Sequence, residues 1–174
     1  MSPTKWYKNP EMIVALSALF IGLLTAVISV YSAYVDRQYA RSSVWPRLEI
    51  YKSFNPQEKS FRYGIANRGT GPATIETVKV SFDSQFIKKW EDIDALSQNY
   101  SQSTINSRTL PSGQIIDALV YKGDEFQAVF NADSKVKIEL CYCSIYQECW
   151  TIDRANKPKQ IKQCSIIPEQ AFEE

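Results

Sequence analysis

The side chains with the most chemical potential in this sequence are its cysteines, which all lie in the last quarter of the chain: Cys141, Cys143, Cys149 and Cys164. No histidine occurs among the 174 residues, which removes both the commonest general base and the commonest metal ligand. A nucleophilic cysteine would then need a neighbouring lysine or arginine to lower its pKa. We therefore expect no catalytic residue, no cofactor and no enzymatic activity.

Three of the four cysteines lie within the run CYCSIYQECW, which is typical of a β-hairpin. Its turn would bring Cys143 near Cys149, and a disulfide between them leaves Cys141 and Cys164 as the natural second pair. Four cysteines allow three pairings, and spacing alone does not choose among them. Four reduced thiols are the alternative in a cytoplasmic domain. A zinc site is not expected, because its usual signature is two Cys-x-x-Cys pairs and this chain has a Cys-x-Cys.

An acidic cluster is the other group that could do chemistry. Paired carboxylates can act as acid and base, and Glu91, Asp92 and Asp94 lie close together in the sequence. They follow Lys88 and Lys89 on a segment with helix-like spacing. The simpler interpretation is a solvated face with local ion pairs.

Three aromatic residues flank the predicted hairpin turn: Tyr142, Tyr146 and Trp150. Exposed tyrosine and tryptophan are frequent anchors of protein interfaces, so this hairpin is our candidate recognition element. Packing of the same rings around a disulfide is the alternative. The sequence does not choose between the two.

The first element that must position these groups is an apolar run from Ile13 to Val35, with no charge between Glu11 and Asp36. A helix needs roughly 20 apolar residues to cross a bilayer core of about 30 Å, and this run is longer. A cleaved signal peptide has a shorter apolar region of about 7 to 15 residues. Tyrosines line the far end as an interfacial belt would: Tyr31, Tyr34 and Tyr39. We therefore predict one uncleaved transmembrane helix.

Small side chains follow one face of this predicted helix: Ala15, Ala18, Gly22, Thr25, Ser29 and Ser32. Helices in a bilayer associate through close backbone approach, which small residues permit, so self-association is predicted. The pattern also fits a second phase: Ala18, Gly22, Ala26, Ser29 and Ala33. No ionisable residue lies within the run, so nothing marks an ion path.

The side of the membrane on which the rest of the chain lies is ambiguous. Lys5 and Lys8 precede the run, and more basic residues follow it: Arg37, Arg41, Arg47 and Lys52. This count leans towards a cytoplasmic C-terminal part. Four cysteines lean towards an oxidising compartment instead.

The chain beyond the helix alternates β-branched and aromatic stretches with turn signals such as NRGTGP at residues 67–72. Seven strands are predicted, at residues 47–54, 60–66, 74–82, 103–109, 114–121, 135–143 and 148–153. A short helix is predicted over residues 85–96, and a bulge at Thr77. Seven strands at this spacing predict an immunoglobulin-like antiparallel β-sandwich, so the fold class is mainly β.

The predicted organisation has four parts: an N-terminal tail (1–12), a transmembrane and juxtamembrane helix (13–42), the β-sandwich (46–166) and a loose acidic tail (167–174). The formal net charge is +1, so no overall field would attract nucleic acid. We expect the membrane and a protein, or a second copy of the chain, as partners.

The runs NPEMIVALSA, SSVWPRLEI, NRGTGPATIETVKVSF and CYCSIYQECW together resemble a broad group of bacterial single-span membrane proteins of unassigned function. The resemblance implies an anchored β-domain in a bacterial inner membrane and brings no activity with it. Two functions remain. One is an interaction or assembly subunit that docks a partner through a sheet edge or the aromatic hairpin. The other is a small oligomeric membrane effector of the defence type, which forms a pore or perturbs the membrane when its β-domain senses a ligand or partner.

Overall fold

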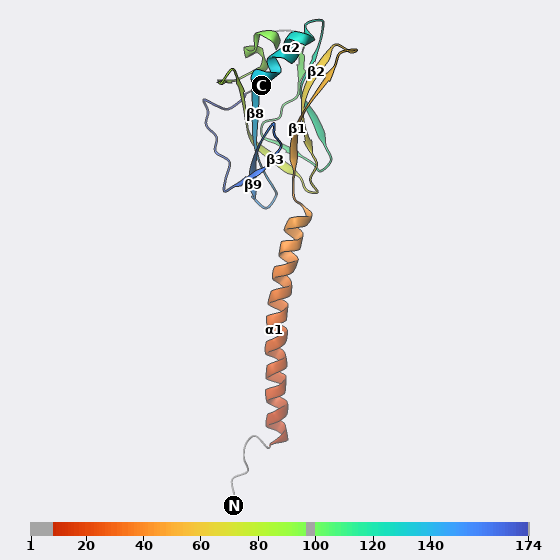
Figure 1. Ribbon diagram of the computed structural model, residues 1–174. Helices are drawn as coiled ribbons and strands as arrows, with labels where there is room; N and C mark the ends of the chain where they lie inside the picture. Colours follow the sequence, from red (N-terminus) through yellow and green to blue (C-terminus); the bar gives the residue numbers. More distant parts are fainter. Residues whose placement is uncertain (1–8, 97–99, 174) are drawn as a thin grey trace, which may run out of the picture. The chain divides into compact units, whose positions relative to one another are not determined.

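The computed structural model describes residues 9–96 and 100–173 of the chain (Figure 1). The chain divides into two units, Met1–Ser42 and Ser43–Glu174. One long helix makes up the described part of the first unit, and the second is mainly β. The predicted fold class, an N-terminal helix followed by a β-sandwich, is confirmed.

Helix α1 runs from Pro10 to Ser43. Proline fits its first position, where a missing N–H leaves no intrahelical bond unmade. Hydroxyls inside the helix donate to carbonyls one turn back, as Thr25 does to Ile21 and Ser29 does to Thr25, so the helix satisfies these groups itself. With 34 residues, it is long and apolar enough to span a membrane.

Ten strands in the described residues form two antiparallel sheets. Sheet A has the order β1-β2-β7-β5, and sheet B has the order β10-β9-β8-β3-β4, with β6 also paired to β3. The strand bounds are β1 Leu48–Asn55, β2 Ser60–Asn67, β3 Ala73–Phe82, β4 Gln85–Ile87, β5 Tyr100–Gln102, β6 Arg108–Leu110, β7 Ile115–Lys122, β8 Val136–Cys143, β9 Cys149–Asp153 and β10 Lys159–Ile161.

The core lies between the sheets and follows from alternation along the strands. Leu48 and Ile50 of β1 are buried, and so are Ile75 and Val78 of β3. The alternation changes phase between the last two because the β3–β8 register shifts between Ile75 and Thr77. Ile75 pairs with Tyr142 and Thr77 with Cys141, so the extra residue is Glu76 and the irregularity lies one residue before the predicted bulge at Thr77.

The predicted strands correspond to β1, β2, β3, β6, β7, β8 and β9, while the short strands β4, β5 and β10 have no predicted counterpart. The largest difference lies at residues 103–109, of which only the last two belong to a strand, β6. Ser107 has a positive φ of 51°, a conformation that interrupts an extended chain. Ile105 nevertheless reaches the core and is buried.

The short helix predicted over residues 85–96 is wrong. Asp83 and Ser84 both have positive φ, 52° and 71°, and form a two-residue turn that folds β4 back onto β3. The residues after β4 form two separate 3₁₀ helices, η2 (Trp90–Asp92) and η3 (Asp94–Leu96), with an extended residue between them. The apolar residues Trp90, Ile93 and Leu96 are buried from these short 3₁₀ turns, and their spacing does not mark an α-helix.

The α-helix of the domain lies further along the chain. Helix α2 covers Phe126–Ala132 and is followed by η4, Asp133–Lys135. Two of its phenylalanines pack against Phe54 of β1, with ring centroids 5.5 Å apart for Phe126 and 4.3 Å apart for Phe130. α2 thus connects β7 of sheet A to β8 of sheet B and covers an end of β1.

The C-terminal residues are packed against the domain, which corrects the loose tail predicted over residues 167–174. Phe172 is only 1 % exposed, and its N–H donates to the Val78 carbonyl (3.0 Å). Its ring packs edge-on against Trp90, with centroids 4.8 Å apart. β6 and β4 occupy the two ends of this edge of β3, and Phe172 fills the gap between them.

Candidate functional site

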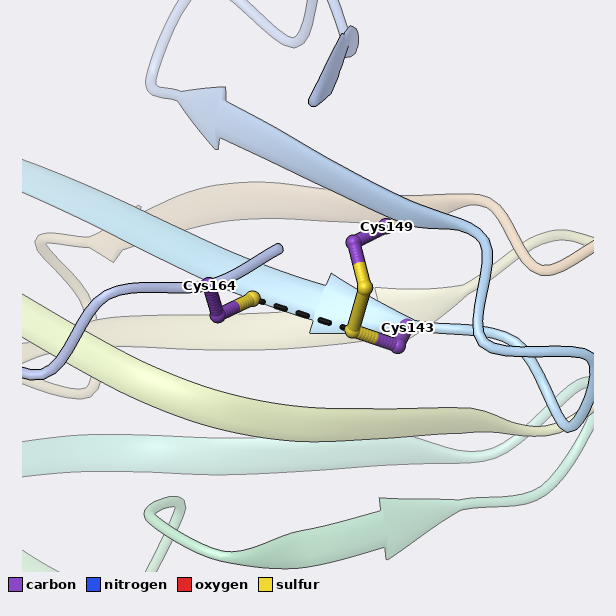
Figure 2. Close-up of side chains that lie close together, drawn as sticks. All are labelled: Cys143, Cys149 and Cys164. Atoms are coloured by element: carbon purple, nitrogen blue, oxygen red, sulfur yellow. Dashed lines mark hydrogen bonds between the residues drawn. A yellow bond between two sulfur atoms is a disulfide. The ribbon is translucent and has the colours of Figure 1, made fainter. Parts of the chain in front are cut away.

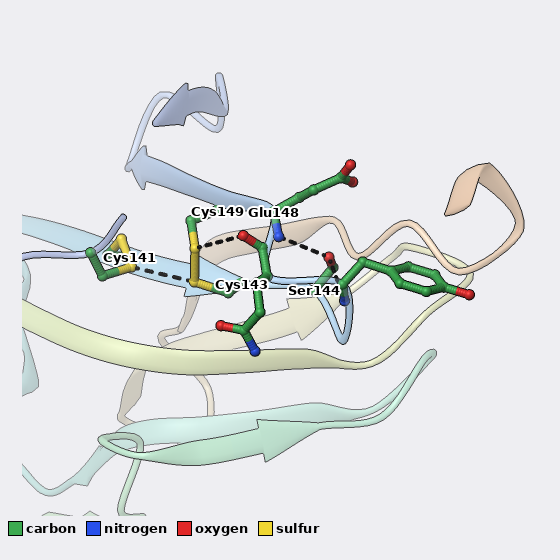
Figure 3. The surroundings of a disulfide bond; sticks show 8 residues. Cys141, Cys143, Ser144, Glu148 and Cys149 are labelled. Atoms are coloured by element: carbon green, nitrogen blue, oxygen red, sulfur yellow. Dashed lines mark hydrogen bonds between the residues drawn. A yellow bond between two sulfur atoms is a disulfide. The ribbon is translucent and has the colours of Figure 1, made fainter. Parts of the chain in front are cut away.

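The β8–β9 hairpin carries three of the four cysteines and ends in a tight turn. Cys143 and Cys149 are directly opposite each other in the register. The Ser144 N–H donates to the Glu148 carbonyl (2.8 Å). The Ser144 hydroxyl in turn accepts from the N–H groups of Tyr146 (3.2 Å) and Glu148 (3.3 Å) (Figure 3). One serine therefore closes the turn from both sides.

Two disulfides lie side by side on the outer face of this hairpin. One joins Cys143 to Cys149 and the other joins Cys141 to Cys164, which are the two pairs favoured from the sequence. The Sγ atoms of Cys143 and Cys164, which are not bonded to each other, lie 3.8 Å apart (Figure 2). Cys164 is partly exposed, while the other three are buried. No free thiol remains in the described chain.

Two of the three hairpin aromatics belong to the core, which corrects their interpretation as exposed anchors. Tyr142 and Trp150 are buried, and their rings stack with centroids 5.7 Å apart. Trp45 stacks on Trp150 at 5.9 Å. Only Tyr146 is exposed, beside the exposed Ile145. The recognition surface expected at the hairpin is therefore limited to the tip of its turn.

A cavity of about 540 Å³ opens on the outer face of sheet B, nearer the start of β8 than the disulfides. Ligand sites typically have volumes of about 300 to 1,000 Å³. Phe86 of β4, which is half exposed, contributes an apolar wall. The charged side chains of the lining come from β3, β8 and the end of β9: Lys79, Lys137, Glu139, Asp153 and Arg154. No local pattern in the sequence marks this surface.

Arg154 in the cavity wall is held by a buried aspartate. Asp133 accepts hydrogen bonds from Arg154 Nη2 (2.5 Å), from the Tyr63 hydroxyl (2.7 Å) and from Lys52 Nζ. Arg154 Nη1 also donates to the carbonyls of Asp133 (2.8 Å) and Val136 (2.6 Å). Lys52 and Tyr63 belong to sheet A, whereas Arg154 follows β9 of sheet B. The network therefore ties the two sheets together.

The network keeps Asp133 ionised and Tyr63 neutral. Burial by itself raises the pKa of Asp133, but hydrogen bonds from Lys52 and Tyr63 and the charge of Arg154 outweigh it, so the pKa lies below its ordinary value. Burial and the Asp133 carboxylate raise the pKa of Tyr63 far above its ordinary value. Neither group changes protonation near neutral pH. A paired charge of this kind positions Arg154 and does not suit a proton shuttle.

One member of the acidic cluster, Asp92, stabilises the turn that begins at Lys88. The Asp92 carboxylate accepts hydrogen bonds from the N–H groups of Lys88 (2.8 Å) and Lys89 (3.0 Å). These two bonds lower the pKa of Asp92, and the bond from the Lys89 N–H has the larger effect. Glu91 accepts from the Tyr100 hydroxyl (3.1 Å), so the two carboxylates serve separate contacts.

The sheet edges offer little room for an added strand, one of the predicted docking modes. Asn156 occupies one position on the free edge of β1, because its Oδ1 accepts from the Ile50 N–H (2.7 Å) and its Nδ2 donates to the Ile50 carbonyl (2.8 Å). The amide thus imitates a neighbouring strand. The other edge strands of the described chain, β4, β5 and β10, have three residues each. Short or covered edges resist strand addition.

A buried asparagine fixes the segment that leads into the β-domain. Asn67 is fully buried, and its carboxamide makes four hydrogen bonds. Oδ1 accepts from the N–H groups of Arg47 (3.3 Å) and Gly69 (3.0 Å), and Nδ2 donates to the carbonyls of Gly71 (2.8 Å) and Leu110 (2.9 Å).

A Cβ on Gly71 would lie 1.8 Å from the Val44 carbonyl oxygen. Glycine is therefore required for this close approach.

The small-residue face of α1 is exposed along its length. The helix has no buried residue in the described chain. Gly22 has no atom within 4 Å of the position that a Cβ would occupy. Self-association through this face stays a prediction.

The groups that organise the domain, Asn67, Asp133 and Arg154, are absent from the sequence-based candidates. No local pattern marks them, because their partners are remote: Lys52 lies 81 positions before Asp133. An asparagine directly before a glycine-containing turn is the one signal that could have singled out Asn67.

Comparison with known proteins adds one match. Residues 13–163 match a family described as a domain of unknown function (DUF8453). The match includes the apolar segment of α1 and all ten strands. No curated protein matches the chain.

Proposed function

Because the chain belongs to the DUF8453 family, whose description names no activity, we propose its function from the structure. The chain is a single-span membrane protein whose β-domain docks a partner protein as an interaction or assembly subunit. Helix α1 supports the anchor, since it is long and apolar enough to span a membrane. The observation that carries the docking role is the cavity on the outer face of sheet B. We propose no catalytic role.

We further propose that the β-domain faces the oxidising side of a bacterial inner membrane. The resemblance to bacterial single-span proteins suggests the membrane. The two disulfides support a location of the β-domain on the oxidising side, because such bonds persist in oxidising compartments and are rare in the cytosol. The excess of basic residues after the span, including Arg37 and Arg41, favours the opposite side. That excess is small, so we give the two disulfides more weight.

The sandwich itself is proposed to be immunoglobulin-like. The order β1-β2-β7-β5 corresponds to strands A-B-E-D of that fold, and β9-β8-β3-β4 corresponds to G-F-C-C′. Antibody domains have one disulfide between their sheets, from strand B to strand F. Here one bridge joins the strands equivalent to F and G, and the second fastens the segment after β10 to F.

The other docking modes are less suitable than the cavity. Strand addition meets short or covered edges, and the hairpin rings are mostly in the core. The outer face of sheet B combines a concave surface with an exposed aromatic ring. Partner proteins favour such surfaces, because an apolar side chain can be buried in them.

The charges of the cavity indicate what the partner presents. Lys79 forms an ion pair with Glu139 (3.9 Å), and Arg154 is bound to Asp133. Two cavity residues, Lys137 and Asp153, form no ion pair with any residue that the structure describes. We therefore expect the partner to present an acidic group to Lys137 and a basic group to Asp153, with an apolar side chain next to them against the aromatic wall.

Photo-crosslinking in intact cells tests this surface. A benzoylphenylalanine replacing Phe86 should give one discrete adduct, and the same probe replacing Gln57, in the exposed β1–β2 turn, should not. The substitution Lys137→Glu should lower the adduct yield about tenfold, which corresponds to roughly 1.4 kcal/mol. Identical adducts from both probe positions, or a yield unchanged by Lys137→Glu, would exclude the cavity as the docking site.

The oligomeric membrane effector is the second candidate, and the small residues along one face of α1, Gly22 among them, support it. Leucine at this position would keep two helices apart. Crosslinking in membranes should therefore show fewer oligomers for Gly22→Leu and no change for Val30→Leu, which keeps an apolar branched side chain. Equal oligomer yields in both variants would remove this candidate.

A further inference from the structure

The sulfur atoms of Cys143, Cys149 and Cys164 lie close together beside β8 and β9 (Figure 2). Cys141 and Cys143 are alternate residues of β8 and so point to the same face. Cys149 lies opposite Cys143 on β9. The Sγ atoms of Cys143, Cys149 and Cys164 all lie within 4.8 Å of one another, and Cys141 is bonded to Cys164.

Three of the four sulfurs are close enough to one another to bind a common metal ion once the bridges are reduced. Zinc–sulfur bonds are about 2.3 Å long, so the sulfurs of such a site are separated by about 3.8 Å. The sulfurs of Cys143 and Cys164, which belong to different bridges, are already 3.8 Å apart. The two sulfurs within each bridge have to move apart, and the sulfur of Cys141, which is not one of the three that lie within 4.8 Å of one another, has to move towards those of Cys143 and Cys149. Rotation about χ1 is the motion that displaces a cysteine sulfur.

The surroundings suit a closed structural site. Cys141, Cys143 and Cys149 are at most 5 % exposed, so four thiolates would surround the ion with little access for water. A zinc ion with four thiolates carries a net charge of −2. Lys159 lies in the same row of sheet B as Cys141, opposite Thr151 on β9, which places it two strands or roughly 10 Å away. The positive charge of Lys159 would partly offset the negative charge of the zinc–thiolate site.

We propose that the reduced chain binds one zinc ion through Cys141, Cys143, Cys149 and Cys164. A phosphine reductant opens each bridge: the phosphorus becomes the phosphine oxide with the oxygen of one water molecule, and the two sulfurs take up two electrons and two protons. Zinc binding then displaces the thiol protons. The disulfide and zinc forms use the same sulfurs and exclude each other, so the redox state of the compartment selects between them.

The inference rests on the cysteine cluster and is independent of the proposed docking role. The full chain in detergent, treated with a phosphine, should bind one Co²⁺ per chain with the visible absorption of tetrahedral cobalt thiolate. Zn²⁺ should displace the cobalt, and the untreated chain should bind none. Absence of uptake by the reduced chain, or one ion shared by two chains, would overturn the proposal.

A variant and a second measurement identify the ligands. Cys164→Ser should weaken cobalt binding at least tenfold, whereas Ser165→Ala on the same segment should leave it unchanged. X-ray absorption of the zinc-loaded wild type should show four sulfur ligands at about 2.3 Å, a result that does not depend on whether the variant folds. Nitrogen or oxygen in place of any sulfur, or an unchanged affinity in Cys164→Ser, would overturn the assignment.

Discussion

The two disulfides should stabilise the domain unequally, because they close chain segments of different length. The sequence separation is 23 for Cys141–Cys164 and 6 for Cys143–Cys149. In the loop-entropy relation, crosslinking lowers the entropy of the unfolded chain by about 11 and about 7 cal/mol/K respectively. At 25 °C these values correspond to about 3.4 and about 2.2 kcal/mol. Loss of the longer closure should therefore cost about 1.2 kcal/mol more.

Urea unfolding of the full chain in detergent, without reductant, measures this difference. The two double variants to compare replace Cys141 and Cys164, or Cys143 and Cys149, with serine. Tryptophan fluorescence reports the transition because Trp90 and Trp150 are buried, and Ser165→Ala serves as the control. Domains are typically stable by roughly 5 to 15 kcal/mol, so both variants are expected to fold. A variant of the short bridge that loses as much stability as the other, or more, would refute the reasoning.

Three further predictions concern stability. Asn67→Ala should lower the free energy of unfolding by about 4 kcal/mol in urea titrations, since four buried hydrogen bonds are worth about 1 kcal/mol each, while Thr70→Ala in the exposed turn after β2 should change it by less than about 0.5 kcal/mol. In acid, the lowered pKa of Asp133 makes its contribution complete above about pH 4 and lost as the pH falls through the folded value; the urea midpoint should fall less steeply for Asp133→Asn, and equal slopes would contradict this. In alkali, burial raises the pKa of Tyr51 to about 12 and that of Tyr63 further. Stability should therefore decline above about pH 10, where unfolded tyrosines ionise, and a flat profile to pH 11 would exclude this effect.

Much of the fold could be predicted because its signals are local. The length and apolarity of α1, the period-two alternation of β1, β3 and β8, and the irregularity next to Thr77 depend on near neighbours in the chain. The hairpin likewise brings Cys143 opposite Cys149 from its own turn. The helix predicted over residues 85–96 was wrong because the turn at Asp83 and Ser84, which folds the chain back onto β3, outweighs the helix-like spacing of the apolar residues.

The sequence by itself determined that the chain has an apolar helix long enough to span a membrane, a β-rich remainder and clustered cysteines with no histidine. Only the tertiary structure decided which side chains act together. Asp133 gains its role from Lys52 and Tyr63, and Phe172 becomes part of the core by filling a gap along β3. The cavity likewise forms only where β3, β4, β8 and the end of β9 meet. Burial and pairing of this kind arise when two sheets stack, and a local pattern carries no information about remote partners.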